Sequence, residues 1–387
     1  MRAPSLFASS LRGLRDLRSL CGLLTLLTLL LCAAPLSASH ASAAPVTGFD
    51  GPGEPVSAAL LRPALSDEEG YGEKYTFDAD LGEGDSFYFS MQITNLGSGD
   101  HKMTARGAVS VGGVKRSWVF KRDKGKWSSE AGLSVKAGGA HLSGTPEELR
   151  FRVTNGDLKV DFTFRPLAPT WQPPGGGLRL GGHHTVYQLF PLSRVEGTLQ
   201  LPGAAPDAPP LSRSGKGWGT HTRSTLGPHE QSLWTTQLRA IDLSSDTTLY
   251  LRELFTTEDY GKRRLSYALV TKGEEVLFEG FNFTPTVTKT FTDTRHENRY
   301  KVAEDFSVDI PDVRRPGVRL TGSFRSLKRT HYKNPIANES WVVRKVIERF
   351  SQPMEYAYQM RYDVKLVGSN ITAEGDDAKL EVYHFND

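Results

Sequence analysis

The sequence predicts an all-β protein made of antiparallel sheets. Apolar residues recur at every second position in many short runs, which is the period of a strand with one buried face and one polar face. The 38 glycines and 22 prolines among 387 residues suit the many turns that such strands need. Strands of this kind, separated by turns, are typical of β-barrels and β-sandwiches.

The first strong strand signals include a hairpin. Apolar and mostly polar residues alternate over 86–93, over 149–154 and over 158–165. Asn155-Gly156 lies between the last two runs. An Asn-Gly pair in that position predicts a two-residue type I′ turn, which requires positive φ at both residues. We therefore predict a β-hairpin over 149–165.

The alternation continues in the second half of the chain. It is present over 195–201 and over 249–255, and the longest run covers 356–366. Glu253 is an exception, because it occupies a position at which its neighbours on the same face are apolar. These runs extend the prediction of antiparallel strands to nearly the whole chain.

One amphipathic helix is predicted near the C-terminus, where apolar residues follow the i, i+3, i+4, i+7 rule over 343–350. Asn338 or Ser340 can cap its start, and Pro353 follows its end. We expect this helix to pack against a barrel wall or to close one mouth of a barrel. The alternative is a helix on a membrane surface, which would need more basic residues on its polar face.

The N-terminus has the three parts of a secretory signal peptide. Four arginines precede an apolar run over 21–34, and Ala41-Ser42-Ala43 fits an A-x-A cleavage site. The run is shorter than the ~20 residues that span a membrane, although a membrane anchor and a buried helix are the alternatives. We predict a signal peptide over 1–43 and an irregular leader over 44–70. The protein would then be exported, to the periplasm or out of the cell.

Removal of this segment changes the charge and the cysteine content. The segment contains four Arg and one Asp, so 43 basic and 43 acidic residues remain and the mature net charge is zero. A balanced charge disfavours nucleic acid as a partner. Cys21 and Cys32 both lie in the segment, so the mature chain has no thiol for a disulfide, a metal ligand or a nucleophile.

A proline- and alanine-rich stretch over 203–210 has no strand periodicity and is the best domain boundary in the sequence. It predicts an N-terminal domain over 71–203 and a C-terminal domain over 204–387. Each is long enough for one β-barrel. We expect a monomer.

Catalytic motifs are scarce. The sequence contains no complete phosphate-binding loop, zinc motif or G-x-S-x-G elbow, so we expect neither a metal nor a cofactor. Histidine is the side chain best suited to proton transfer near neutral pH, and His184 and His221 lie close to the predicted domain junction. Either one is also a candidate for an ordinary structural histidine.

Aromatic residues gather near the same junction, at Trp171, Tyr187, Phe190, Trp218 and Trp234. They form either ordinary core or the wall of an apolar ligand pocket, because barrels that are not filled by side chains enclose such cavities. In the second case His184, His221 or Gln237 would orient the polar end of the ligand.

Several segments together resemble a known family. They are Pro191–Thr198, similar to a Pro-x-x-x-Val-x-Gly-Thr strand beginning; Pro228 followed by Trp234; the Phe-x-Thr-x-x-Tyr turn at Phe255–Tyr260; and the C-terminal segments Trp341–Val346 and Tyr356–Gln359. In this order they resemble the lipocalin-like survival-factor family first known from yeast, within a wider group that includes carotenoid hydratases and fungal decalin-forming cyclases. The matches extend over roughly residues 85–385.

The resemblance implies two tandem lipocalin-like β-barrels, an apolar ligand and a link to stress survival. Members of the group either carry lipids or convert polyenes and polyketides without a metal or cofactor. The hydratase branch carries an acidic residue where this chain has Thr220. Because threonine cannot protonate an alkene, a hydratase would need an acid elsewhere.

Two functions follow as hypotheses, and the alternative to both is a structural envelope protein whose barrels are filled by side chains and contain no cavity. The first is an exported carrier of a lipid or another hydrophobic small molecule, which contacts a membrane only transiently, during ligand exchange. The second is a cofactor-free cyclase, isomerase or hydratase that acts on a polyene or polyketide inside a barrel, with His221 or His184 as the acid–base residue.

Overall fold

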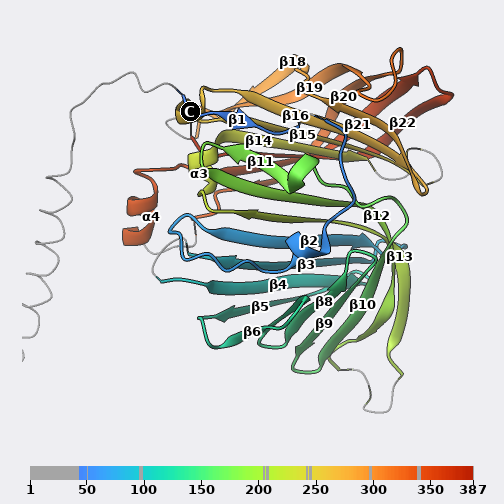
Figure 1. Ribbon diagram of the computed structural model, residues 1–387. Helices are drawn as coiled ribbons and strands as arrows, with labels where there is room; N and C mark the ends of the chain where they lie inside the picture. Colours follow the sequence, from blue (N-terminus) through green and yellow to red (C-terminus); the bar gives the residue numbers. More distant parts are fainter. Residues whose placement is uncertain are drawn as a thin grey trace, which may run out of the picture. The chain divides into compact units, whose positions relative to one another are not determined.

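The computed structural model describes residues 43–49, 51–95, 99–203, 205, 209–240, 243, 246–295, 299–337 and 341–386. Within them the predicted all-β class is confirmed, because two antiparallel sheets curl into a barrel and a half-barrel (Figure 1). Residues 1–42 of the predicted signal peptide and the helix caps Asn338 and Ser340 lie outside the described residues.

The first sheet contains 13 of the described strands, and its main path is β5-β4-β3-β2-β13-β12-β10-β9-β8-β7-β6. β1 pairs with β11, which pairs in turn with β12. The strands are β1 (Val46–Thr47), β2 (Gly72–Asp80), β3 (Ser86–Thr94), β4 (Lys102–Val111), β5 (Val114–Arg122), β6 (Trp127–Ser129), β7 (Leu133–Ala137), β8 (Ala140–Thr145), β9 (Glu148–Asn155), β10 (Leu158–Pro166), β11 (Gly177–Leu180), β12 (His183–Gln200) and β13 (Leu211–Ser224).

The second sheet contains nine of the described strands in the order β17-β16-β15-β14-β22-β21-β20-β19-β18. They are β14 (Ser232–Ala240), β15 (Thr247–Thr256), β16 (Arg264–Lys272), β17 (Glu275–Phe281), β18 (Thr286–Thr292), β19 (Lys301–Pro311), β20 (Arg319–Lys333), β21 (Met354–Val367) and β22 (Ile371–His384). In Figure 1 this sheet lies above the first one.

The chain changes sheet later than the proline- and alanine-rich stretch. That stretch connects β12 with β13, and β13 pairs with both β12 and β2 of the first sheet. The change of sheet falls between Ser224 and Ser232, where the short helix α3 (Pro228–Gln231) lies. Sequence composition marks where the backbone is irregular, but strand pairing decides to which sheet a strand belongs.

The predicted hairpin over 149–165 is confirmed by β9 and β10, but its turn differs from the expected type I′. Asn155 pairs with Leu158, so the central residues of the turn are Gly156 and Asp157. Only Gly156 has positive φ, at 60°. Glycine with positive φ at the first central position is the arrangement of a type II′ turn.

The inner face of the first sheet is filled by phenylalanine side chains. The ring of Phe151 lies 4.7 Å from that of Phe164, 4.8 Å from that of Phe77 and 5.1 Å from that of Phe89, measured between centroids. A separate buried cluster contains side chains of both sheets, among them Tyr187 of β12 and Tyr267 of β16. This cluster joins the two halves of residues 43–387.

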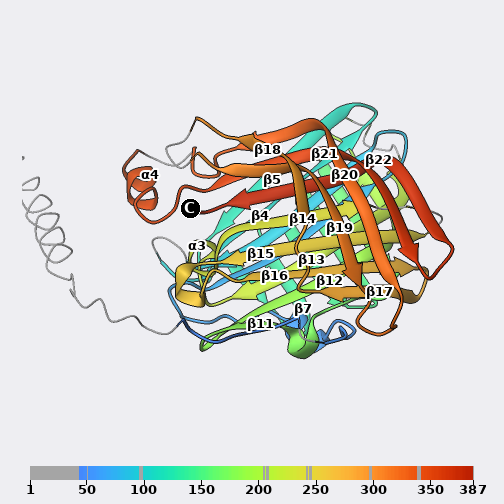
Figure 2. The same cartoon turned by 90° about the horizontal axis from the view of Figure 1, so that it is seen from above.

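The described helices are short: α2 (Ala58–Leu61), α3 and α4 (Trp341–Ile347). Two 3₁₀ turns also occur, at Pro174–Gly176 and Glu258–Tyr260. α4 confirms the predicted C-terminal helix, and it lies to one side of the sheets in Figure 2. The expected packing of its apolar side on a barrel is wrong for Val346 and Phe350, which are 55% and 62% exposed. Periodicity predicts a helix but does not show what covers it.

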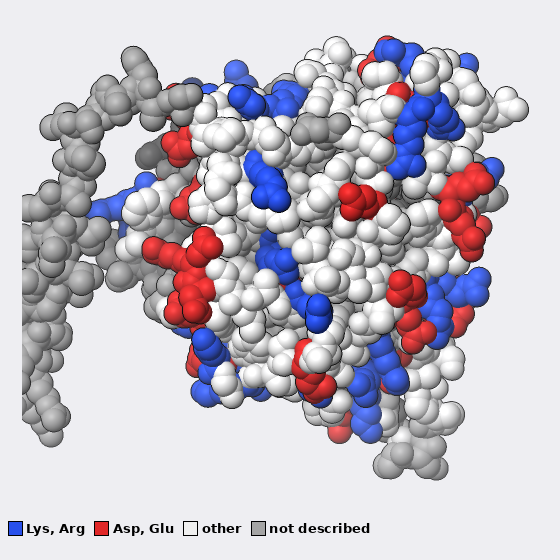
Figure 3. Space-filling model, viewed as in Figure 1, with Lys and Arg blue, Asp and Glu red and all other residues white. Residues whose placement is uncertain are grey.

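Two further findings concern the described part of the chain. None of its helices is long and apolar enough to cross a membrane. On the face shown in Figure 3, basic and acidic side chains are interspersed, as the balanced composition suggests.

Candidate functional site: a cavity between the two sheets

A cavity of about 880 Å³ lies between the polar faces of the two sheets. On β2, the residues Lys74, Thr76 and Asp78 line it, while Tyr75 and Phe77 between them are buried on the other face. Strand alternation produces this division, because successive side chains point to opposite faces. The polar face of the strand therefore forms a cavity wall.

The neighbouring strands extend this wall in register. Asp78 of β2 pairs with Trp218 of β13 and with Tyr88 of β3, and all three residues line the cavity. Thr220, where the hydratase branch of the resembled family has an acid, pairs with Thr76. Asp78 is thus two residues along β2 from the partner of Thr220, on the same cavity wall.

The opposite wall comes from the second sheet. Gln237 of β14 pairs with Glu381 of β22, and both line the cavity together with Lys379 and Tyr383. A volume of about 880 Å³ lies within the range of ligand pockets, roughly 300–1,000 Å³. The cavity is large enough for a small organic molecule.

Asp78 is an acid of this cavity whose pKa is raised. Burial raises the pKa of its carboxyl above the ordinary value, and the nearby cations Arg239 and Lys379 oppose part of the rise. Burial also lowers the pKa of Arg239. For Glu381, burial acts to raise the pKa, but Lys379 and Arg239 together hold it below the ordinary value. Two carboxyl groups in one cavity therefore have opposite shifts, the pattern of an acid and an ionised partner.

The Trp218 ring contacts the guanidinium of Arg239, and its indole N–H has no hydrogen-bond partner among the described residues. The guanidinium of Arg239 lies 3.7 Å from the centroid of the Trp218 ring, a distance typical of a cation–π contact. The indole Nε1 of Trp218 is buried and has no hydrogen-bond partner among the described residues. A buried donor without a partner is costly, so a ligand acceptor at this position would be stabilised.

A chain of hydrogen bonds connects the sheets beside the cavity. The hydroxyls of Tyr187 and Tyr250 lie 2.6 Å apart, and the Tyr250 hydroxyl donates to Gln237 Oε1 at 2.6 Å. Gln237 Nε2 then donates to Glu381 Oε2 at 3.1 Å. Arg252 lies over the Tyr187 ring at 4.1 Å. These contacts hold side chains of the two sheets together beside the cavity.

Three of the residues singled out from the sequence meet at this cavity. Tyr187, Trp218 and Gln237 all line it. Trp171 lies in the cluster between the sheets, where its ring stacks on Tyr267 at 4.6 Å and its Nε1 donates to Glu279 Oε1 at 2.7 Å. The prediction of an aromatic wall near the junction thus applies to part of the set.

His221 lies on the opposite face of β13, in a fully buried polar cluster. Its Nε2 is 2.7 Å from Glu73 Oε1 and its Nδ1 is 2.8 Å from Gln188 Oε1. Its ring stacks on Tyr75 at 4.3 Å. Burial lowers the pKa of His221, and the hydrogen bond to Glu73 opposes this. Since both ring nitrogens already have partners, the geometry gives His221 a structural role.

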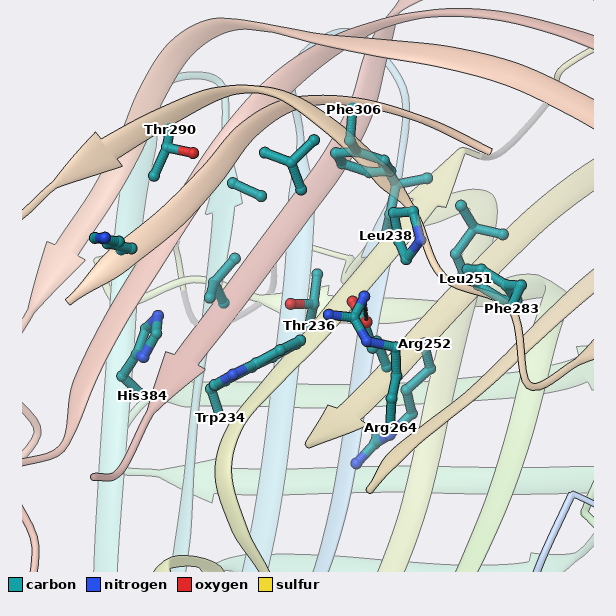
Figure 4. A pocket seen from close by; sticks show the side chains of 16 residues that line it. Trp234, Thr236, Leu238, Leu251, Arg252, Arg264, Phe283, Thr290, Phe306 and His384 are labelled. Atoms are coloured by element: carbon teal, nitrogen blue, oxygen red, sulfur yellow. Dashed lines mark ion pairs between the residues drawn. The ribbon is translucent and has the colours of Figure 1, made fainter. Parts of the chain in front are cut away.

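The other predicted site residues lie elsewhere. His184 is partly buried opposite Arg179 in the β11–β12 pairing, and burial lowers its pKa. Phe190 belongs to the core of the first sheet, 5.5 Å from Phe77. Trp234 lines a separate pocket on the inner face of the second sheet (Figure 4). Proximity in the sequence did not predict proximity in space for these three.

The charged residues of the cavity were missed by the sequence-based reasoning. Asp78 and Glu381 of the lining, and the nearby Arg239, stand at polar positions of alternating strands, where the pattern indicates a solvated face. Only the packing of one polar face against another reveals them. In the described part of the chain, no three His, Cys, Asp or Glu side chains are grouped as metal ligands would be.

The fold is that of a lipocalin-like protein with two β-barrel-type sheets. Three solved structures share it at low identity. CghA has 11% identity and a TM-score of 0.56 over 90% of this chain and 96% of that chain. CghA with Sch210972 has 9% identity and a TM-score of 0.53 over 82% and 89%. An AttH-assigned protein from Nitrosomonas europaea has 11% identity and a TM-score of 0.50 over 81% and 92%.

These likenesses concern the fold. A search of protein-family models matched none, and a search of curated proteins matched none. The lipocalin-like fold that the resemblance implies is shared with these structures, whereas the survival-factor family itself is not shown.

Proposed function

We propose that the protein is an acid–base enzyme that cyclises, isomerises or hydrates a hydrophobic small molecule of the polyene or polyketide class in the cavity between the sheets. Asp78 would donate the proton. The observation that carries the proposal is the Asp78 carboxyl, which lines the cavity and has a raised pKa. This is the second of the two hypotheses from the sequence, with the reaction moved from a barrel interior to the space between the sheets.

The chemistry requires an acid that can donate a proton to the substrate. In the acid-catalysed form of these reactions, the first step is protonation of an alkene or a carbonyl, and a carboxyl with a raised pKa is better suited to it than an ordinary one. The cross-strand neighbours Tyr88 and Trp218 give the site apolar surface against which a hydrophobic substrate can lie. The acid that Thr220 does not provide is thus available from β2.

The charges favour an enzyme over a simple carrier. A carrier needs apolar surface and one polar contact, whereas this cavity contains Asp78, Lys379 and Glu381. The fold is shared with CghA, whose structure with the small molecule Sch210972 supports a role in small-molecule chemistry. Export, a monomeric state and transient membrane contact remain proposals from the sequence.

The test is turnover of material from the organism that makes the protein. Mature wild-type protein would be incubated with an organic extract of that organism, and products followed by liquid chromatography and mass spectrometry. We expect the substitution Asp78→Asn to reduce turnover by on the order of 100-fold or more, as for removal of a general acid. Asp157→Asn, in the exposed β9–β10 turn, is the matched control and should retain activity.

Native mass spectrometry separates binding from chemistry. If a small molecule co-purifies with wild-type protein, Asp78→Asn should retain it too, because the amide is similar in size to the carboxyl. Turnover that stays within threefold of wild type in Asp78→Asn would remove Asp78 as the acid. A bound compound that wild-type protein never converts would favour the carrier hypothesis instead.

A further inference from the structure

The inner face of the second sheet contains an apolar pocket that is separate from the cavity between the sheets. Its volume is about 260 Å³. In Figure 4, Trp234, Leu251, Phe306 and His384 come from four different strands and surround the same space. The equivalent face of the first sheet is instead filled by packed phenylalanines. The two halves therefore differ in a way that ordinary core packing does not require.

One carboxylate lies inside this pocket. Glu253 of β15 is 9% exposed in its side chain and forms an ion pair with Arg264 of β16. Burial raises its pKa to about 7, although Arg264 acts in the opposite direction. Glu253 is the residue that interrupts the apolar face of 249–255 in the sequence. A buried charge is costly unless it is paired, and Arg264 supplies the partner here. Carboxyl groups with strongly shifted pKa values are concentrated at functional sites.

The remaining polar lining carries an excess of positive charge. Arg264, Lys301 of β19 and Arg252 of β15 are the cations, and Glu253 is the one carboxylate among the lining residues. His384 of β22 also faces the pocket, and burial lowers its pKa to about 4, so it is neutral at pH 7. Arg264 is 31% exposed in its side chain and lies 5.5 Å from the ring of Trp234. An anion would find a cation available here.

We propose that this pocket is a second binding site, for an apolar carboxylate of the size of a medium-chain fatty acid. The ligand carboxylate replaces Glu253 as the ion-pair partner of Arg264, and the hydrocarbon chain lies against Leu251 and Phe306. Glu253 takes up one proton as its partner is lost, so the charge in the pocket stays balanced. A volume of about 260 Å³ is just below the usual range for drug-sized ligands, which favours a slender molecule.

The site is independent of the proposed enzyme function. The cross-strand partners Thr236 and Glu253 line this pocket. The next pair along the strands, Gln237 and Arg252, lines the cavity between the sheets. Thr236 and Arg252 each line both sites. The β14–β15 pair is therefore a wall shared by two sites. A failure of Asp78 to act as an acid would leave this proposal unaffected.

The test uses the full mature protein and decanoate as the probe, with decan-1-ol as the uncharged control, in isothermal titration calorimetry. We expect one equivalent of decanoate to bind at pH 7. Arg264→Gln should weaken decanoate binding by at least about tenfold and decanol binding by less than about threefold. Arg264→Lys keeps the charge and should recover most of the affinity.

Proton uptake supplies a second readout. With a Glu253 pKa of about 7, the fraction already protonated rises as pH falls, so decanoate affinity should increase about tenfold from pH 8 to pH 6. Titrations in two buffers of different ionisation enthalpy should show uptake of up to one proton, and Glu253→Gln should abolish it.

Three outcomes would overturn the proposal. The first is an absence of decanoate binding to wild-type protein, and the second is decanoate binding to Arg264→Gln as tight as to wild type. The third uses Leu251→Trp, whose larger side chain fills the pocket: decanoate binding is kept in this variant but lost in Trp218→Ala. The last result would place the ligand between the sheets. Circular dichroism of each variant confirms that it is folded.

Discussion

Glu73 shows how a single buried charge is stabilised in this fold. Its side chain has no exposed surface, yet it accepts hydrogen bonds from the Tyr71 hydroxyl at 2.5 Å and the Ala64 amide at 3.1 Å, besides its contact with His221. Burial alone would raise its pKa, but the hydrogen bonds from His221 and Tyr71 hold it below the ordinary value. The carboxylate is stable because its partners are already in place.

Removal of one partner should therefore be costly. We expect His221→Ala to lower the free energy of unfolding by about 3–5 kcal/mol, because it leaves Glu73 without its closest ring donor. The measurement is urea unfolding at pH 7. His184→Ala is the matched control, and its partly exposed side chain should cost less than about 1 kcal/mol.

A different result would change the role of His221. Normal stability together with lost turnover in His221→Ala would assign this residue to the chemistry, as the sequence first suggested. Equal losses of unfolding free energy in His221→Ala and His184→Ala would show that the hydrogen bonds to Glu73 add no more stability than an ordinary side chain does.

At the scale of elements, the alternation of apolar and polar residues predicted the strands, but it did not predict which surfaces pack against each other. The runs over 86–93, 249–255 and 356–366 lie in β3, β15 and β21. The same pattern indicated that each strand has one solvent-exposed face. In β2 and β13 that face is a cavity wall, which depends on what the rest of the chain places opposite it.

The C-terminal helix α4 gives a test at this scale. We expect Val346→Ser and Phe350→Ser each to change the free energy of unfolding by less than about 0.5 kcal/mol, since both side chains are mostly exposed. Phe324→Ser, at a fully buried position of β20, should cost at least about 3 kcal/mol. Chemical denaturation followed by circular dichroism provides the values. A loss of 2 kcal/mol or more in the variant of α4, Val346→Ser, or of the turn after it, Phe350→Ser, would mean that this segment packs on the sheets.

At the scale of the whole molecule, residues 43–387 form one compact unit, and specific contacts join its sheets. Glu279 of β17 accepts from Trp171 Nε1 at 2.7 Å and lies 2.6 Å from Arg314 Nε. Burial raises the pKa of Glu279, and the Trp171 hydrogen bond opposes the rise. Because Trp171 lies between β10 and β11 of the first sheet and bridges to Leu189 of β12, this contact couples the two halves.

Loss of that contact should uncouple their unfolding. We expect wild-type protein to unfold in one calorimetric transition, and Trp171→Phe to broaden or split it with a loss of about 1–3 kcal/mol, since the buried Glu279 oxygen loses the shorter of its two hydrogen bonds and keeps only the one from the Gly53 amide. Trp127→Phe removes a hydrogen bond to the His101 carbonyl within the first sheet and should lower stability without splitting the transition. Splitting in both variants, or in neither, would contradict a coupling role for Trp171.

The sequence by itself determined the all-β class, the hairpin at β9–β10, the C-terminal helix and the polar exception at Glu253. These are local properties, because periodicity and turn chemistry act within a few residues of chain. The lipocalin-like fold also followed from short segments in a fixed order, which resemble those of a known family. The sequence placed Tyr187, Trp218 and Gln237 in a candidate site without showing what surrounds them.

Only the tertiary structure decided where the chemistry lies. Asp78, Arg239 and Glu381 come from strands that are distant in the chain, and each occupies a position that the pattern assigns to solvent. The packing of two polar faces against each other encloses these charges, and burial then shifts their pKa values. A pKa shift depends on the surrounding dielectric and on neighbouring charges, and neither exists until the sheets have packed.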